Sequence, residues 1–141
     1  MARGGVFGLL GKEIPLFTDV GLLVMRLLLG GTMLFAHGVP KLLGFAEKQA
    51  SFADPLGVGS ATSLALVVGA EVGAAVTLAA GFQTRLSTLP LIIAMAVAFF
   101  VVHGADPWQR RELAFLYMVG YLSLFVSGGG RFSLDKILFS K

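Results

Sequence analysis

Three residues that carry or can carry a positive charge lie within one long apolar segment near the N-terminus. The segment covers residues 20–43, and it holds Arg26, His37 and Lys41. At 100° per residue in an α-helix, His37 lies about 20° round from Arg26, and Lys41 lies about 40° further. The three side chains are therefore predicted to form one polar edge of a helix. Charges inside a membrane are expensive and usually functional, which makes this edge a candidate site.

A single carboxylate, Glu71, lies near the centre of a second apolar segment, residues 61–82. A carboxylate in such a place is either protonated or paired with a cation. Arg26 is the predicted partner, because a guanidinium keeps its charge in almost any environment. Two interpretations stay open. One is a fixed Arg26–Glu71 ion pair that holds two helices together, and the other is a protonatable Glu71 that carries protons in transport or redox coupling.

A polar pocket is predicted at the end of the molecule opposite the termini. His103 ends a third apolar segment and Glu112 begins a fourth, so both should lie at the depth of His37 and Lys41. Tyr117 adds a hydroxyl one turn further along the fourth segment. We predict that these five side chains line one ligand-binding pocket. A few donors between apolar walls are what a headgroup of the quinone type needs.

Metal chemistry is not predicted from these residues. Two histidines at one depth could ligate a metal or a haem, but the chain has no cysteine and no H-x-x-x-H spacing. The absence of cysteine also excludes disulfides, thiolate nucleophiles and C-x-x-C redox motifs. We predict no metal site, assign no residue as catalytic, and name quinone as the one cofactor the pocket could take.

Four apolar segments must position these residues: they cover residues 20–43, 61–82, 86–103 and 107–127. Each approaches the roughly 20 residues that cross about 30 Å of hydrocarbon as a helix. The chain is 56% hydrophobic and 13% charged, against about 25% charged in soluble domains, and no segment has a polar stripe. We predict an all-α fold, an integral membrane bundle of four transmembrane helices in a single domain over residues 1–141.

Four crossings would place both termini on one side of the membrane. Six basic residues then lie on the terminal side and four on the other: Arg3, Lys12, Arg85, Arg131, Lys136 and Lys141 against Lys41, Lys48, Arg110 and Arg111. This bias predicts termini in the cytoplasm. Residues 1–19 have no long apolar core and no small-residue cleavage site, so a removable signal is not expected.

The lipid bilayer is the first predicted partner. A net charge of +3 is compatible with nucleic-acid binding, but no basic stripe with interleaved aromatics is present, so nucleic acid is not expected. Gly69, Gly73, Thr77 and Gly81 form a small-residue stripe on the side of their helix opposite Glu71. This stripe could pack on a neighbouring helix of the same chain, on another membrane subunit or on a second copy.

Several short motifs follow one another along the chain between about residues 21 and 135. They are Arg26-Leu27-Leu28-Leu29-Gly30, His37-Gly38-Val39-Pro40-Lys41-Leu42, Glu71 with Gly73, Gly81-Phe82-Gln83-Thr84-Arg85, His103-Gly104, Glu112-Leu113-Ala114 with Tyr117, and Gly128-Gly129-Gly130-Arg131 with Ser133-Leu134-Asp135. In this order and spacing the chain resembles the DoxX family of small four-helix membrane proteins.

The resemblance implies a protein of the bacterial cytoplasmic (inner) membrane with a role in redox work. Members of the family are associated with thiosulfate oxidation that delivers electrons to quinone, and with oxidative-stress assemblies. We therefore predict a redox-linked, quinone-facing subunit of a membrane complex, in which a partner brings the electron donor. The alternative is a non-catalytic accessory subunit that packs on a larger membrane complex. Whether the chain is an enzyme by itself stays open.

Overall fold

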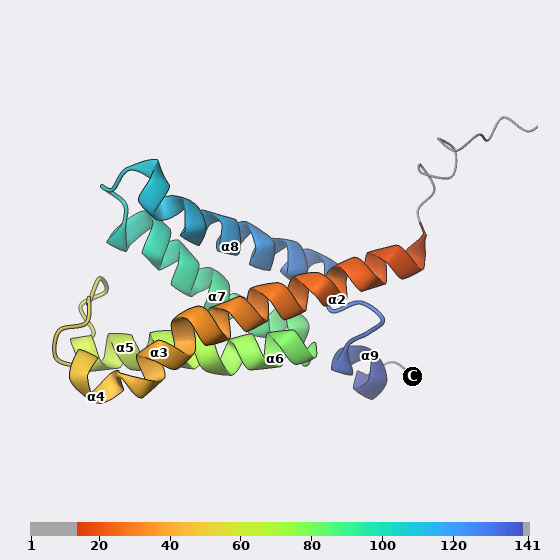
Figure 1. Ribbon diagram of the computed structural model, residues 1–141, viewed down its shortest axis with the longest axis horizontal. Helices are drawn as coiled ribbons and strands as arrows, with labels where there is room; N and C mark the ends of the chain where they lie inside the picture. The colour runs from red at the N-terminus through yellow and green to blue at the C-terminus, as the bar shows by residue number, and fades with distance from the viewer. Residues whose placement is uncertain (1–13, 140–141) are drawn as a thin grey trace, which may run out of the picture.

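The computed structural model describes residues 14–139, and within them the chain forms helices and connecting turns with no β-strand. Four long helical rods dominate the structure (Figure 1). The first rod consists of α2 (Pro15–Thr32), the π-helical segment η1 (Met33–Gly38) and α3 (Val39–Leu43); the second of α5 (Ser60–Val68), η2 (Gly69–Ala74) and α6 (Ala75–Ala80); the third of α7 (Thr84–Val97) and η3 (Ala98–Val102); and the fourth of α8 (Trp108–Ser127). Two short helices, α4 (Phe45–Lys48) and α9 (Leu134–Phe139), complete the fold.

Three of the rods are long and apolar enough to cross a membrane. They are Pro15–Leu43 with 29 residues, Ser60–Ala80 with 21 and Thr84–Val102 with 19. At 1.5 Å per residue, even the shortest spans about 28 Å. The fourth rod, α8, has 20 residues, but its first turns carry Arg110, Arg111 and Glu112. The prediction of an all-helical membrane protein is thus confirmed, with three helices that meet the requirements for a span.

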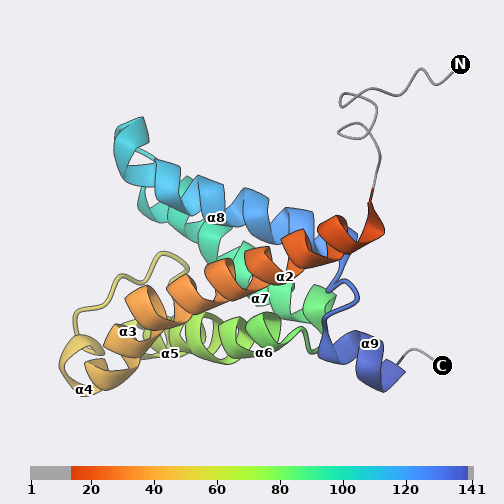
Figure 2. The same cartoon turned by 45° about the vertical axis from the view of Figure 1, so that its right-hand side comes forward.

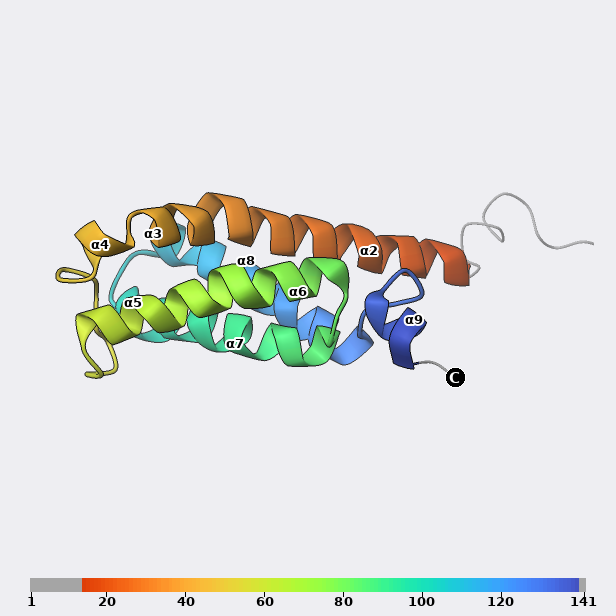
Figure 3. The ribbon, with the colours of Figure 1, turned by 90° about the horizontal axis from the view of Figure 1, so that it is seen from below.

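The first and second rods run antiparallel and touch closely along their length (Figure 3). Two glycines of the first rod make this approach possible. A Cβ on Gly30 would lie 2.8 Å from the Ala75 carbonyl oxygen, and a Cβ on Gly38 would lie 2.6 Å from that of Glu71. These two contacts fix which residues of the two rods lie at the same depth. The stripe predicted on the second rod is divided. Nothing lies within 4 Å of a Cβ placed on Gly69 or Gly73, whereas Thr77 Oγ1 lies 2.7 Å from Ser87 Oγ of α7 and Gly81 packs against Arg26.

Three π-helical segments interrupt the rods, and each carries or adjoins one of the polar residues singled out above. His37 lies in η1, Glu71 lies in η2, and His103 directly follows η3. A π-turn inserts an extra residue between hydrogen-bonded groups and shifts the face that the following residues present; such turns are frequent at functional sites.

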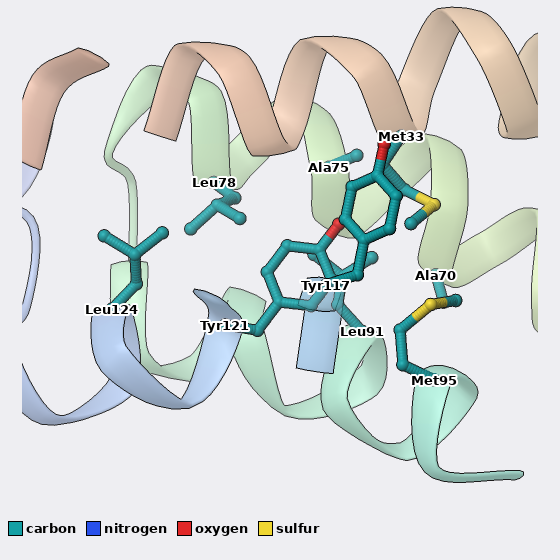
Figure 4. Close-up of a cluster of buried hydrophobic side chains, with 9 residues drawn as sticks. All are labelled: Met33, Ala70, Ala75, Leu78, Leu91, Met95, Tyr117, Tyr121 and Leu124. Atoms are coloured by element: carbon teal, nitrogen blue, oxygen red, sulfur yellow. The ribbon is translucent and has the colours of Figure 1, made fainter. Parts of the chain in front are cut away.

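The core lies where the four rods cross, around the two tyrosines of α8 (Figure 4). Tyr121 is fully buried, and its hydroxyl donates to the Leu29 carbonyl oxygen over 3.3 Å. The other members of the cluster are Met33, Ala70, Ala75, Leu78, Leu91, Met95, Tyr117 and Leu124. The outer faces are apolar as well, with Phe35 71% and Val126 76% exposed. An outside of this kind suits lipid and not water.

Candidate functional site

A cavity of about 610 Å³ lies among the four rods, near the end opposite the described termini. Figures 1 and 2 show that α7 and α8 diverge from α3 and α5 toward this end, which forms a fork. The polar residues that line the cavity are His37, Lys41, Ser63, Glu71, His103, Arg110 and Tyr117. Its remaining lining is apolar: Met33, Phe52, Ala53, Pro55, Leu56, Leu66, Val67, Ala70, Pro90, Ile93, Ala94, Met95, Val97, Ala98, Val102, Leu113 and Ala114.

One ion pair lies in the wall of this cavity. The Lys41 ammonium, one turn beyond η1, donates to Glu71 Oε2 over 2.6 Å. The Glu71 side chain is only 5% exposed, whereas that of Lys41 is 24% exposed. The carboxylate is therefore enclosed by the bundle, and the ammonium connects it to the cavity.

The predicted Arg26–Glu71 pair is wrong, because Glu71 has Lys41 as its partner. Both predicted members are buried within the bundle, but they lie at different depths. Gly38 lies against Glu71, and about 18 Å of helix separates Gly38 from Arg26. The register set by Gly30 and Gly38 thus brings Lys41 to the carboxylate and leaves Arg26 far below it.

Arg26 instead ties the chain together at the terminal end of the bundle. Its Nη1 donates to the Ala79 carbonyl oxygen over 3.2 Å, and its Nη2 donates to that of Phe132. The side chain is fully buried, and it joins the end of α6 to the loop before α9. Beside it, the Asp135 carboxylate accepts the backbone N–H groups of Gln83 and Thr84 at the start of α7, over 2.6 and 2.8 Å. The contacts of this second polar cluster join α6 and the start of α7 to the C-terminal segment, so its role is structural.

His37 and Tyr117 meet across the inner end of the cavity. Their ring centroids are 5.9 Å apart in an edge-on arrangement. The Tyr117 hydroxyl donates to Thr32 Oγ1 over 2.9 Å and so joins α8 to α2. The imidazole of His37 has no hydrogen-bond partner among residues 14–139, so its nitrogens are available to a molecule in the cavity.

His103 and Arg110 lie on the opposite wall, which α7, η3 and α8 form. His103 Nδ1 lies 2.8 Å from Asp106 Oδ2, and this contact orients the imidazole. Arg110 lies about 20° from Tyr117 around α8, so both side chains are on the face of this helix that lines the cavity.

Glu112 does not line the cavity. It is exposed, and it lies about 200° round α8 from Arg110. Its inclusion in the pocket was an error of helix rotation, because similar depth does not imply the same face. Phe35, Phe99 and Phe100 do not line the cavity either.

No group of three histidine, aspartate or glutamate side chains within residues 14–139 is arranged to hold a metal ion. His37 and His103 belong to opposite walls of the cavity. The chemistry that the described site offers is hydrogen bonding and ion pairing through Lys41, Glu71 and the two histidines.

The loop between α4 and α5 covers the outer end of the cavity with Phe52, Pro55 and Leu56. Asp54 fastens this loop to α5. Its carboxylate accepts the Ser63 hydroxyl over 2.7 Å, together with two backbone N–H groups at 2.8 and 2.9 Å. These hydrogen bonds, that of Ser63 first, hold the pKa of Asp54 below its usual value.

The fastening should depend on pH in the direction that follows from this lowered pKa. Its contribution to stability is full above about pH 4, the usual aspartate value, and it is lost as the pH falls through the lower pKa of the folded loop. The protection factors of the Val58 and Gly59 amides, which are exchange rates corrected for the intrinsic dependence of exchange on pH, should therefore fall at acid pH. In an Asp54→Asn variant exchange should be faster at neutral pH and lose this acid step. Equal exchange in both proteins at all pH values would contradict the assignment.

The fold and the cavity define a class: a helical membrane protein with a mostly apolar internal cavity that carries a buried ion pair. Residues 21–104 match the DoxX family, and the chain belongs to that family. This confirms the resemblance drawn from the motifs.

Two relatives match over most of their own length. An uncharacterized protein of Haemophilus influenzae is 31% identical over 129 residues, which cover 86% of this chain and 85% of that protein. The inner membrane protein YqjF of Escherichia coli is 30% identical over 127 residues, which cover 87% of this chain and 95% of YqjF. No solved structure matches the chain.

Proposed function

We propose that the chain crosses the bacterial inner membrane four times, with both termini in the cytoplasm. The inner-membrane location is supported by the name of the relative YqjF. The fourth crossing would be α8, whose 20 residues correspond to about 30 Å of helix. The charges in its first turns are compatible with an interfacial position beside Trp108. Arg111 donates to the Gly104 carbonyl oxygen over 2.8 Å and lies over the Phe99 ring, and these two contacts offset part of the cost of its charge.

The function that the cavity supports best is binding of a quinone-type molecule as part of a redox-linked membrane subunit. The observation that carries this proposal is a single cavity in which His37, Lys41 and Glu71 face mostly apolar walls. Its volume, 610 Å³, lies within the roughly 300–1,000 Å³ of ordinary ligand pockets. The Lys41 ammonium and the His37 imidazole would donate to a quinone carbonyl oxygen, and His103 and Tyr117 would border the same head.

Reduction of a quinone to a quinol takes up two electrons and two protons. The protons could pass through Glu71 or the histidines. Because the chain has no cysteine for thiol redox chemistry, we propose that the electrons come from a donor held by a partner protein. The proposal therefore includes a partner subunit, and the chain alone would bind quinone without reducing it.

A binding experiment tests the proposal. Protein purified in mild detergent should yield quinone in an organic extract analysed by mass spectrometry, and it should bind added decylubiquinone saturably. His37→Phe keeps a ring against Tyr117 but removes the free nitrogens, so it should weaken binding about tenfold, the equivalent of one good hydrogen bond at 1.4 kcal/mol. Phe35→Leu, on the exposed face of the same helix, is the matched control and should bind normally.

The alternative is a non-catalytic accessory subunit or a homo-oligomer that packs on other membrane proteins. The observation that favours it is the open face at Gly69 and Gly73, where a neighbouring helix could approach closely. If extracts contain no quinone and decylubiquinone does not bind, this alternative replaces the quinone proposal.

A further inference from the structure

The cavity is not enclosed on every side, and its edges differ in whether polar or apolar side chains form them. Four of its large apolar lining residues are more than half exposed: Leu66 at 60%, Ile93 at 61%, Leu56 at 58% and Leu113 at 53%. Leu66 belongs to α5 and Ile93 to α7, and these two helices make little or no packing contact with each other among the described residues. An opening therefore connects the cavity to the outside between them.

The other edges are closed or polar. On the side of α2 and α8, the hydrogen bond from Tyr117 to Thr32 and the contact of Tyr117 with His37 join the two helices. At the outer end, the loop that Asp54 fastens covers the cavity with Phe52 and other apolar residues. Near Leu113, which is half exposed on α8, the first rod contributes the polar side chains of His37 and Lys41 to the lining, besides the buried Met33. The edge between α5 and α7 is apolar on both of its sides.

In a membrane this apolar edge faces acyl chains. Leu66 lies six residues inside the start of α5, and Ile93 lies nine residues inside the start of α7, so both are well within their rods. A molecule dissolved in the bilayer could enter here without leaving an apolar environment. A polar molecule would meet no hydrogen-bond partner at this edge.

We propose that the gap between Leu66 and Ile93 is a lateral opening through which the long apolar tail of the bound ligand runs out into the bilayer. The head lies at the Lys41–Glu71 pair and His37, and the tail passes between α5 and α7. The inference rests on the proposed quinone function and narrows its ligand to a lipid-soluble, tailed molecule such as an isoprenoid quinone. A cavity of 610 Å³ holds a substituted ring and the first part of a tail, and the rest of a long tail requires an exit.

The test compares two probes that share a head: decylubiquinone, with its ten-carbon tail, and the tailless 2,3-dimethoxy-5-methyl-1,4-benzoquinone. Ile93→Trp should obstruct the opening, so it should weaken binding of the tailed probe at least tenfold and leave the tailless probe within about twofold of wild type. Leu86→Trp is the matched control, since Leu86 lies on the same helix with 61% exposure and does not line the cavity. It should change neither affinity.

Three outcomes would count against the inference or its basis. If Ile93→Trp weakens both probes equally, or neither, the tail does not pass this edge and the inference is overturned. If wild-type protein binds neither probe, the proposed function itself has failed, and the tailed ligand is withdrawn with it. If only the tailless probe binds, the cavity takes a water-soluble molecule and the opening has another role.

A second measurement covers the case in which the tryptophan variant does not fold. The chain has no cysteine, so Ile93→Cys introduces a single thiol. Alkylation of that thiol by a membrane-permeant maleimide should be slowed by decylubiquinone. It should be unaffected by 2,3-dimethoxy-5,6-dimethyl-1,4-benzoquinone, which serves here as the tailless probe because its fully substituted ring has no open carbon for the thiol to add to. Protection by both probes, or by neither, would contradict the tail's path.

Discussion

Glu71→Gln should lower the free energy of unfolding by about 3 kcal/mol, because it leaves the Lys41 ammonium in the cavity wall without its counter-charge. Lys41→Met should be similarly harmful, since it leaves a carboxylate that is 5% exposed without its cation. Unfolding of the purified protein in mixed micelles with increasing denaturing detergent would measure both changes.

The double replacement separates the structural role of the pair from a functional one. Lys41→Met with Glu71→Leu removes both charges and keeps approximately the same volume, so it should be within about 1 kcal/mol of wild type. If the pair also serves quinone binding, the double variant should fold and fail to bind decylubiquinone. Normal stability of Glu71→Gln alone, with loss of proton-dependent activity in the assembled complex, would instead favour Glu71 as a proton carrier.

Much of the architecture could be predicted from the sequence, because hydrophobic length alone identifies a helix that crosses a membrane. All four apolar segments correspond to rods, although the first rod starts at Pro15 and not at residue 20. Proline suits the first turn of a helix, where its missing backbone N–H costs no hydrogen bond, so Pro15 can begin α2. The prediction placed the start at residue 20 because it followed the apolar segment and not this helix-start signal. The fourth rod, α8, is less apolar than the other three because its first turns carry three charged residues.

The sequence predicted the depth at which a side chain lies along its helix. It did not predict the direction in which the side chain points around the helix, or the register between two neighbouring helices. His37, Lys41 and His103 line the cavity, since each lies near the same end of its rod, and Tyr117 reaches it from the middle of α8. Glu112 shares their depth but points away. The partner of Glu71 depended on how far two antiparallel rods are shifted, and that shift follows from close contacts at Gly30 and Gly38. Hydropathy contains no information on such contacts.

The π-helical segments explain a further part of what the sequence did not reveal. Angles of 100° per residue hold only along an uninterrupted α-helix, and η1 lies between Arg26 and Lys41. The three residues of the predicted edge, Arg26, His37 and Lys41, also lie at two depths, with Arg26 toward the terminal end. Arg26 belongs to the terminal cluster, whereas His37 and Lys41 belong to the cavity.

Gly81→Ala should destabilise the protein by at least about 3 kcal/mol. The added Cβ strains the backbone at this position and also overlaps neighbouring side chains. Gly81 ends α6 with φ +70°, a left-handed conformation that costs an L-residue roughly 1–2 kcal/mol. A Cβ there would also overlap Arg26 Nη1 and lie 2.6 Å from Ser133 Cβ. Arg26 would have to leave the carbonyl oxygens of Ala79 and Phe132, and a displaced, fully buried guanidinium is costly.

Gly73→Ala provides the control on the same rod. Gly73 lies within η2, where an added Cβ has nothing within 4 Å, so alanine should be neutral or stabilise by about 0.5–1 kcal/mol by restricting the unfolded chain. Unfolding of the two variants under the same detergent conditions measures the contrast. Equal stabilities would mean that Arg26 is not held against Gly81. A loss at Gly73 instead would indicate that a neighbouring helix covers that face in the membrane, because only a partner could make the added methyl group harmful.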